Sequence, residues 1–148
     1  MVSTSMIRTA GARELTLARV THAAAALLLA VGSSGAAADV WFEIGVNDRF
    51  TSYADPATIK RQGNRVTMWS MFDYKTAQAT GAGKKHLSVK RHYEYDCAEQ
   101  RARLLTVIAY AEHQAKGEKV AESDVRLAAS PVAAGTADER LFKYACTK

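Results

Sequence analysis

The sequence has few prolines and cysteines, and no hydrophobic run long enough to cross a membrane. Two prolines and two cysteines occur among its 148 residues. A transmembrane helix needs about 20 consecutive apolar residues, and the longest apolar run, residues 23–31, is much shorter. After residue 39 there are no internal repeats and no linker rich in proline, glycine or serine. These absences favour a single domain with no integral membrane segment in that part of the chain.

The excess of positive charge is modest. Lysine and arginine number 20 against 15 aspartates and glutamates, which gives a formal net charge of +5. Part of that excess comes from three N-terminal arginines, at Arg8, Arg13 and Arg19. A nucleic-acid-binding domain usually concentrates far more basic charge on one face or helix. We therefore expect no nucleic-acid partner.

The first 38 residues have the features of an export signal. The arginines form a positive leader, residues 23–31 are apolar, and Ala36 and Ala38 fit a small-x-small cleavage site. We predict a signal peptide over residues 1–38, with Met1 or Met6 as the start, and a domain of about 110 residues over 39–148. The alternative is a buried N-terminal helix. Because no cysteine lies near the cleavage site, we expect an exported protein, periplasmic or extracellular, that is not a lipoprotein.

Cys97 and Cys146 are the only cysteines. Paired cysteines in an exported protein usually form a disulfide, so we predict a Cys97–Cys146 bond. Two buried free thiols are the alternative. In the chain-entropy model, closing such a loop stabilises the fold by about 4 kcal/mol. We expect the two sulfurs to lie in an apolar layer between a helix and a sheet.

Hydrophobic patterning predicts mostly β-structure. We expect strands at residues 40–45, 49–55, 65–75, 85–97 and 101–113, and a short one near Val120. Asp55-Pro56 should end the second strand, with a turn or short helical connection up to Asn64. Residues 76–85 contain two glycines and should form a loop. The strand at 65–75 is apolar on both faces, which predicts a central strand.

The strand at 85–97 shows the clearest alternation. One predicted face carries Leu87, Val89, Arg91, Tyr93, Tyr95 and Cys97, and the other carries His86, Ser88, Lys90, His92, Glu94 and Asp96.

At the other end of the chain, Thr136 and Glu139 have the spacing of a helix capping box. The following residues predict a C-terminal helix whose apolar side carries Cys146.

No catalytic residues can be assigned. Ser88 lies between His86 and Lys90, but the sequence shows no acid to orient the histidine and no oxyanion turn. His86 and His92 are six residues apart, roughly 20 Å along a strand, and cannot bind one metal ion on their own. We therefore expect a protein that is not an enzyme and that needs no cofactor or metal.

The most basic stretch is the candidate ligand-binding face. It consists of Lys84, Lys85, His86, Lys90 and His92. Such a surface can hold an acidic polysaccharide, a matrix protein or a membrane surface, or it can be a solvated edge that prevents aggregation. Arg101 and Arg103 are expected to pair with Asp96 or Glu99 around the disulfide.

Several short motifs resemble the surface-adhesin protein E family in order and spacing. They are Trp41, Tyr53-Ala54-Asp55, Ile59, Gly63-Asn64, Trp69, Tyr95-Asp96-Cys97, Arg101, Arg103, Tyr110, Gly117 and Cys146. The resemblance covers the whole of residues 39–148. It implies an α+β domain, a single antiparallel sheet of about five to six strands with a C-terminal helix tethered to it by a disulfide.

The resemblance also implies a function. We expect a noncatalytic exported binding module that contacts a protein or acidic polysaccharide of the host matrix or the bacterial envelope. The alternative is a periplasmic structural or assembly-support protein of the cell envelope.

Overall fold

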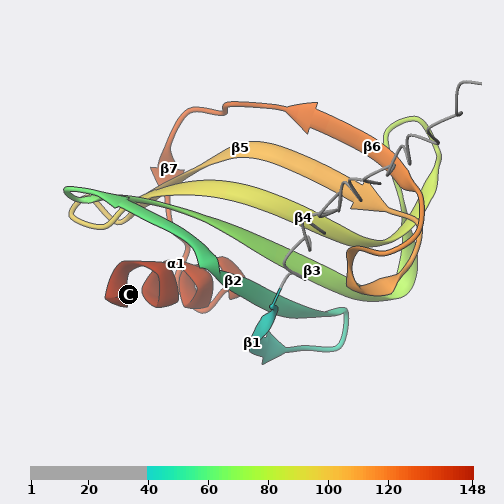
Figure 1. Ribbon diagram of the computed structural model, residues 1–148, viewed down its shortest axis with the longest axis horizontal. Coiled ribbons are helices and arrows are strands. Elements are labelled where there is room, and N and C mark those ends of the chain that lie inside the picture. The colour runs from blue at the N-terminus through green and yellow to red at the C-terminus, as the bar shows by residue number, and fades with distance from the viewer. Residues whose placement is uncertain (1–39) are drawn as a thin grey trace, which may run out of the picture. The chain divides into compact units, whose positions relative to one another are not determined.

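The computed structural model describes residues 40–148 and shows one antiparallel sheet with a C-terminal helix (Figure 1). The predicted signal peptide lies outside the described residues. Six strands follow each other in chain order across the sheet: β1 (Phe42–Val46), β2 (Phe50–Gln62), β3 (Arg65–Ala79), β4 (Lys85–Asp96), β5 (Arg101–Tyr110) and β6 (Lys119–Asp124). A two-residue strand, β7 (Ser130–Pro131), also pairs with β5, and α1 (Ala137–Thr147) follows it. The predicted α+β fold class is confirmed.

Short polar turns connect the first hairpins. The side-chain oxygen of Asn47 accepts hydrogen bonds from the backbone N–H groups of Arg49 and Phe50, at 2.8 and 2.9 Å. Gly63 has a φ of 59°, in the left-handed region that glycine adopts at little cost. The pairs Asn47-Asp48 and Gly63-Asn64 therefore lie where strands reverse direction, and each strand pairs with the next.

The expected end of the second strand at Pro56 is wrong. β2 continues to Gln62, and its register against β3 shifts between Asp55 and Lys60. Proline cannot donate to a ladder hydrogen bond, and a bulge is one of the places where a sheet accommodates it. The irregular segment makes its own bonds: Asp55 accepts one from the Ala57 N–H at 3.1 Å, and the Thr58 hydroxyl donates to the Asp55 carbonyl at 2.7 Å.

β3 is a central strand, as predicted, with β2 and β4 on either side. Its side chains toward α1 form the core with Tyr95 and the buried face of the helix; they include Val66, Met68 and Phe72. On the opposite face Met71 is also fully buried, at 0 % exposed. β3 is longer than expected, because it takes up part of the predicted loop and ends at Ala79.

The C-terminal helix begins at the predicted capping box. The Thr136 hydroxyl accepts a hydrogen bond from the Glu139 N–H at 3.1 Å, and the Glu139 carboxylate accepts one from the Gly135 N–H at 2.7 Å. Ala137, Leu141 and Ala145 recur every four residues and are the buried residues of α1. Among residues 40–148, no helix is long and apolar enough to cross a membrane.

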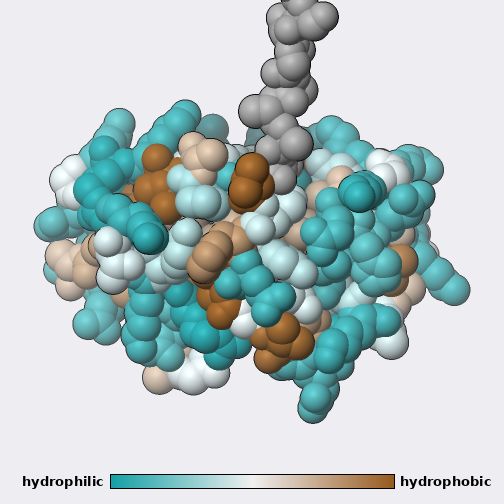
Figure 2. All heavy atoms as spheres, turned by 60° about the horizontal axis from the view of Figure 1, so that its bottom comes forward, coloured by the Kyte–Doolittle hydropathy of each residue, from teal (hydrophilic) through white to brown (hydrophobic). Residues whose placement is uncertain are grey.

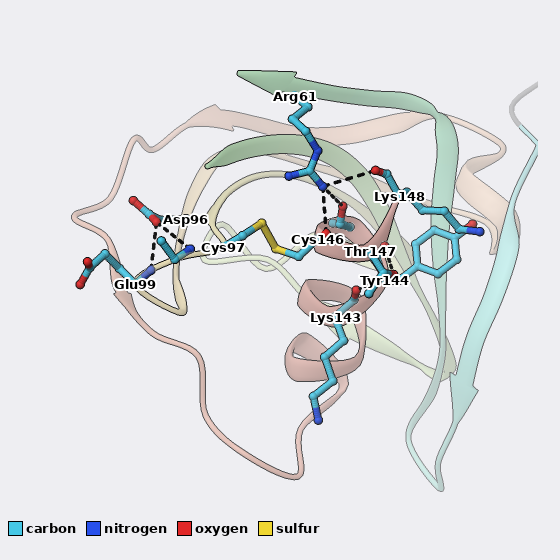
Figure 3. The surroundings of a disulfide bond; sticks show 11 residues. Arg61, Asp96, Cys97, Glu99, Lys143, Tyr144, Cys146, Thr147 and Lys148 are labelled. Atoms are coloured by element: carbon cyan, nitrogen blue, oxygen red, sulfur yellow. Dashed lines mark hydrogen bonds between the residues drawn. A yellow bond between two sulfur atoms is a disulfide. The ribbon is translucent and has the colours of Figure 1, made fainter. Parts of the chain in front are cut away.

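The predicted disulfide is confirmed. Cys97, directly after β4, is bonded to Cys146 in the last turn of α1, with Cα atoms 5.7 Å apart (Figure 3). Both cysteines pack against the core cluster but are only partly buried, so the bond lies at the margin of the apolar layer rather than inside it. At the same end of the helix, Arg61 of β2 donates a hydrogen bond to the Cys146 carbonyl at 2.9 Å. A cation at a helix C-terminus stabilises its unpaired carbonyls.

Candidate binding surface

Two tryptophans and a lysine lie together on the sheet face opposite α1. Trp69 alternates with the core residue Met68 along β3 and so points away from the helix. His92, its register partner on β4, stacks on the indole with ring centroids 4.8 Å apart and planes 8° from parallel. The Lys90 ammonium lies 5.3 Å from the ring centroid of Trp41 and 5.4 Å from that of Trp69. We call these four residues the tryptophan–lysine cluster.

The charge of this cluster comes from lysine rather than histidine. Burial, and in second place the positive charge of Lys60, lower the pKa of His92 below its ordinary value. The imidazole is therefore mostly neutral at neutral pH and acts as a flat ring against Trp69. The ammonium of Lys90, over two indole faces, makes cation–π contacts worth about 0.5–1 kcal/mol each at exposed sites. The cluster thus combines aromatic planes with a cation.

Lys84 and Lys85 lie apart from this cluster, at the end of the β3–β4 hairpin. Both are exposed. The Lys84 N–H donates to the Thr80 hydroxyl at 3.1 Å, and this bond closes the turn. Lys85 is five residues from Lys90, about 17 Å along a strand. The structure therefore provides two separate basic points rather than one continuous patch.

The prediction that His86 shares the outward basic face with Lys90 and His92 is wrong. Only 8 % of His86 is exposed, and its ring meets Tyr74 edge-on with centroids 5.9 Å apart. With Val89 and Arg91 it lines a pocket on the α1 side of the sheet. The cause is a register shift: Asp73 pairs with Ser88, but the next pair is Gln78 with His86. The strict alternation assumed for this strand fails where β3 bulges.

The Ser88 hydroxyl is not available as a nucleophile. It is 0 % exposed, its hydroxyl donates to the Glu112 carbonyl at 2.5 Å, and it accepts from the Ala115 N–H at 3.0 Å. These bonds hold it beneath the segment after β5, while His86 lies on the other side of the sheet. The serine–histidine pair considered from the sequence is not formed. In the part of the chain that the structure describes, no three histidine, cysteine, aspartate or glutamate side chains converge to hold a metal ion.

The segment over Ser88 was predicted in part as strand, at residues 101–113, but β5 ends at Tyr110. It includes the short 3-10 turn η1 (His113–Ala115), in which Gln114 and Ala115 have positive φ angles of 58° and 55°. Asp73 of β3 anchors it, accepting from the Gln114 side chain at 3.0 Å and lying 2.8 Å from the His113 ring. Because these partners are 40 or more residues apart in the chain, no local sequence signal points to the contact.

The arginines near the disulfide do not make the expected pairs. Arg103 pairs with Glu94 at 3.0 Å, and Arg101 donates to the Ala129 carbonyl at 2.5 Å. Asp96 instead accepts from the N–H groups of Ala98 and Glu99 in the β4–β5 turn. The side chains of these charged residues therefore hold the ends of the strands in place. The face of the molecule shown in Figure 2 is mostly hydrophilic, and apolar side chains form small groups on it.

The fold and the surface define a class of small sheet-and-helix domains, in which one sheet face carries a disulfide-tethered helix and the other presents aromatic and basic side chains. A sequence model of the family described as surface-adhesin protein E matches residues 41–147. The chain belongs to this family, and the resemblance seen in the sequence is confirmed.

One solved structure has a similar fold. The structure of Haemophilus influenzae protein E is 12 % identical, with a TM-score of 0.51 over 72 % of this chain and 93 % of that chain. Protein E from non-typeable Haemophilus influenzae is 13 % identical, with a TM-score of 0.46 over 74 % of this chain and 82 % of that chain. A search among curated proteins finds none that matches this chain. At 12 % identity the likeness to the first of these structures concerns the fold alone.

Proposed function

We propose that this protein is a noncatalytic exported binding module that contacts a protein or an acidic polysaccharide of the host matrix or the bacterial envelope. The observation that carries the proposal is the match of the surface-adhesin protein E family over residues 41–147. The tryptophan–lysine cluster is the contact surface that we favour, with Lys84 and Lys85 as a second point of attraction.

The chemistry of the cluster suits such a partner. Tryptophan is enriched at the energetically dominant positions of protein interfaces, where a large flat side chain contributes much contact area. Lys90 lies beside Trp41 and Trp69, so a partner that covers the indole rings also comes close to a positive charge. The more distant Lys84 and Lys85 add long-range attraction that salt screens over about 10 Å at 0.1 M.

Replacing Lys84, Lys85 and Lys90 with glutamine should weaken binding to an acidic polysaccharide and flatten its salt dependence. The physical reason is the loss of three cations from the two basic points. Binding to immobilised heparin, measured across a salt series, gives both quantities. The matched control replaces the exposed Lys75, Lys116 and Lys143, which removes the same charge elsewhere. If both triple variants bind alike, net charge rather than this surface attracts the partner.

Export is tested separately. We propose that residues 1–38 are a cleaved signal peptide and that the domain begins at Asp39, so mass analysis of exported material should find Asp39 at the N-terminus. An intact leader on exported protein would contradict this.

The location of the protein separates the two functions. Protein that added protease digests on intact cells supports adhesion, whereas protein confined to the periplasmic extract after cell fractionation supports a structural or assembly role in the envelope.

A further inference from the structure

The helix leaves part of its own sheet face uncovered. α1 contacts β1, β2, β3 and β4 but lies away from β5 and β6 (Figure 1). On the uncovered part is a pocket of about 350 Å³, which is within the range of about 300–1,000 Å³ typical of small-molecule sites. Its apolar lining includes Val89, Val107, Ala109 and Ala121. Ala109 and Ala121 are register partners on β5 and β6, and their small side chains leave the space.

Two polar side chains of β4 line the same pocket and have unused hydrogen-bonding capacity. His86 is 8 % exposed, and its Nδ1 has no hydrogen-bond partner. The Nε of Arg91 is also buried without a partner. A regular strand would place residues five apart on opposite faces, and the register shift between β3 and β4 instead brings both to this pocket. Leaving a buried polar group unpaired is costly, so Arg91 favours an occupant that supplies a polar group at its end of the pocket.

The charge of the lining points to an anion. Arg91 is the cation of the pocket; its guanidinium lies 3.6 Å from the Phe72 ring centroid and pairs through one nitrogen with Asp138 at 2.6 Å. A guanidinium has five N–H donors, so this pair does not exhaust it. Glu122, the acidic residue of the lining, is paired with Lys119. Burial lowers the pKa of His86, against a smaller opposite effect of a hydrogen bond to the Lys84 backbone, so the ring is mostly neutral and adds no cation to the pocket.

We infer that this pocket binds an apolar carboxylic acid, with the carboxylate at Arg91 and the hydrocarbon body over Val107, Ala109 and Ala121 toward His86. The site is distinct from the proposed macromolecular contact, because the tryptophan–lysine cluster lies on the other face of the sheet. Failure of one proposal therefore leaves the other standing.

The test compares decanoate with decanol, which has the same body without the carboxylate, by titrating the full-length ¹⁵N-labelled chain. Decanoate should produce saturable amide shifts along β4, β5 and β6 around the pocket. Decanol should bind about tenfold more weakly or worse, since a hydrogen bond to a charged group is worth at least that factor. Equal affinity for the two ligands, or no saturable shift with decanoate, overturns the proposal.

Two variants locate the site. Ala121→Leu fills the pocket from the edge strand and should abolish the decanoate shifts, whereas Ala128→Leu, at an exposed position outside the lining, should leave them unchanged. Arg91→Gln tests the anion contact without filling the pocket and should reduce the affinity for decanoate to that for decanol. Unchanged decanoate binding in either Ala121→Leu or Arg91→Gln would show that the fatty acid binds elsewhere.

Discussion

Replacing both Cys97 and Cys146 with alanine is expected to lower the free energy of unfolding by about 2–5 kcal/mol. The bond joins the end of β4 to the last turn of α1 across a sequence separation of 49 residues. Without it the unfolded chain gains conformational freedom. The helix has 11 residues, and helices shorter than about 12–15 residues are marginal alone in water. A loss of this size is large against the total stability of about 5–15 kcal/mol typical of small domains.

Chemical denaturation of the variant and the wild type gives the free-energy difference. Hydrogen exchange locates it: amides of α1 should exchange much faster in the variant, while those of β3 keep most of their protection. Wild-type protein in reductant is the matched control, because it loses the same bond without a change of sequence. A melting temperature within a degree or two of wild type would show that the tether contributes little.

The sequence was informative where structure is local and less so where distant segments meet. The capping box at Thr136 and Glu139 predicted the helix start because both residues act within one turn. The disulfide was predictable because two cysteines in an exported chain allow one pairing. By contrast, the position of His86 depends on how β3 bulges against β4. Alternation within a single strand contains no information about a bulge in its neighbour.

The binding surface shows the same limit. The sequence placed Trp69, Lys90 and His92 on two predicted strands. The stacking of His92 on Trp69, however, depends on the β3–β4 register. Trp41 joins them from outside the sheet, and nothing in its local sequence predicts that contact. Arg61 at the helix end is a similar case, since its partner carbonyl is 85 residues away. Long-range contacts of this kind follow from the topology rather than from periodicity.

Leu141→Ala is the second change expected to have a large effect, about 2–5 kcal/mol. Leu141 is 0 % exposed and lies midway along the buried side of α1, between Ala137 and Ala145. Those two neighbours are already small, so Leu141 is the large side chain among the buried residues of the helix. Its truncation leaves a cavity in addition to the lost transfer free energy. Lys143→Ala, an exposed change on the same helix, should cost no more than about 0.5 kcal/mol.

The two large effects should not add. If the tether keeps the helix docked, removing it leaves α1 partly undocked, and Leu141 then has less packing to lose. Leu141→Ala should therefore cost less in the disulfide-free background than in the wild type, with a coupling of about 0.5–3 kcal/mol in a double-mutant cycle. Denaturation of the four proteins of that cycle measures the coupling directly. Simple additivity would mean that Leu141 docks the helix fully without the bond, and that the disulfide acts on the unfolded chain alone.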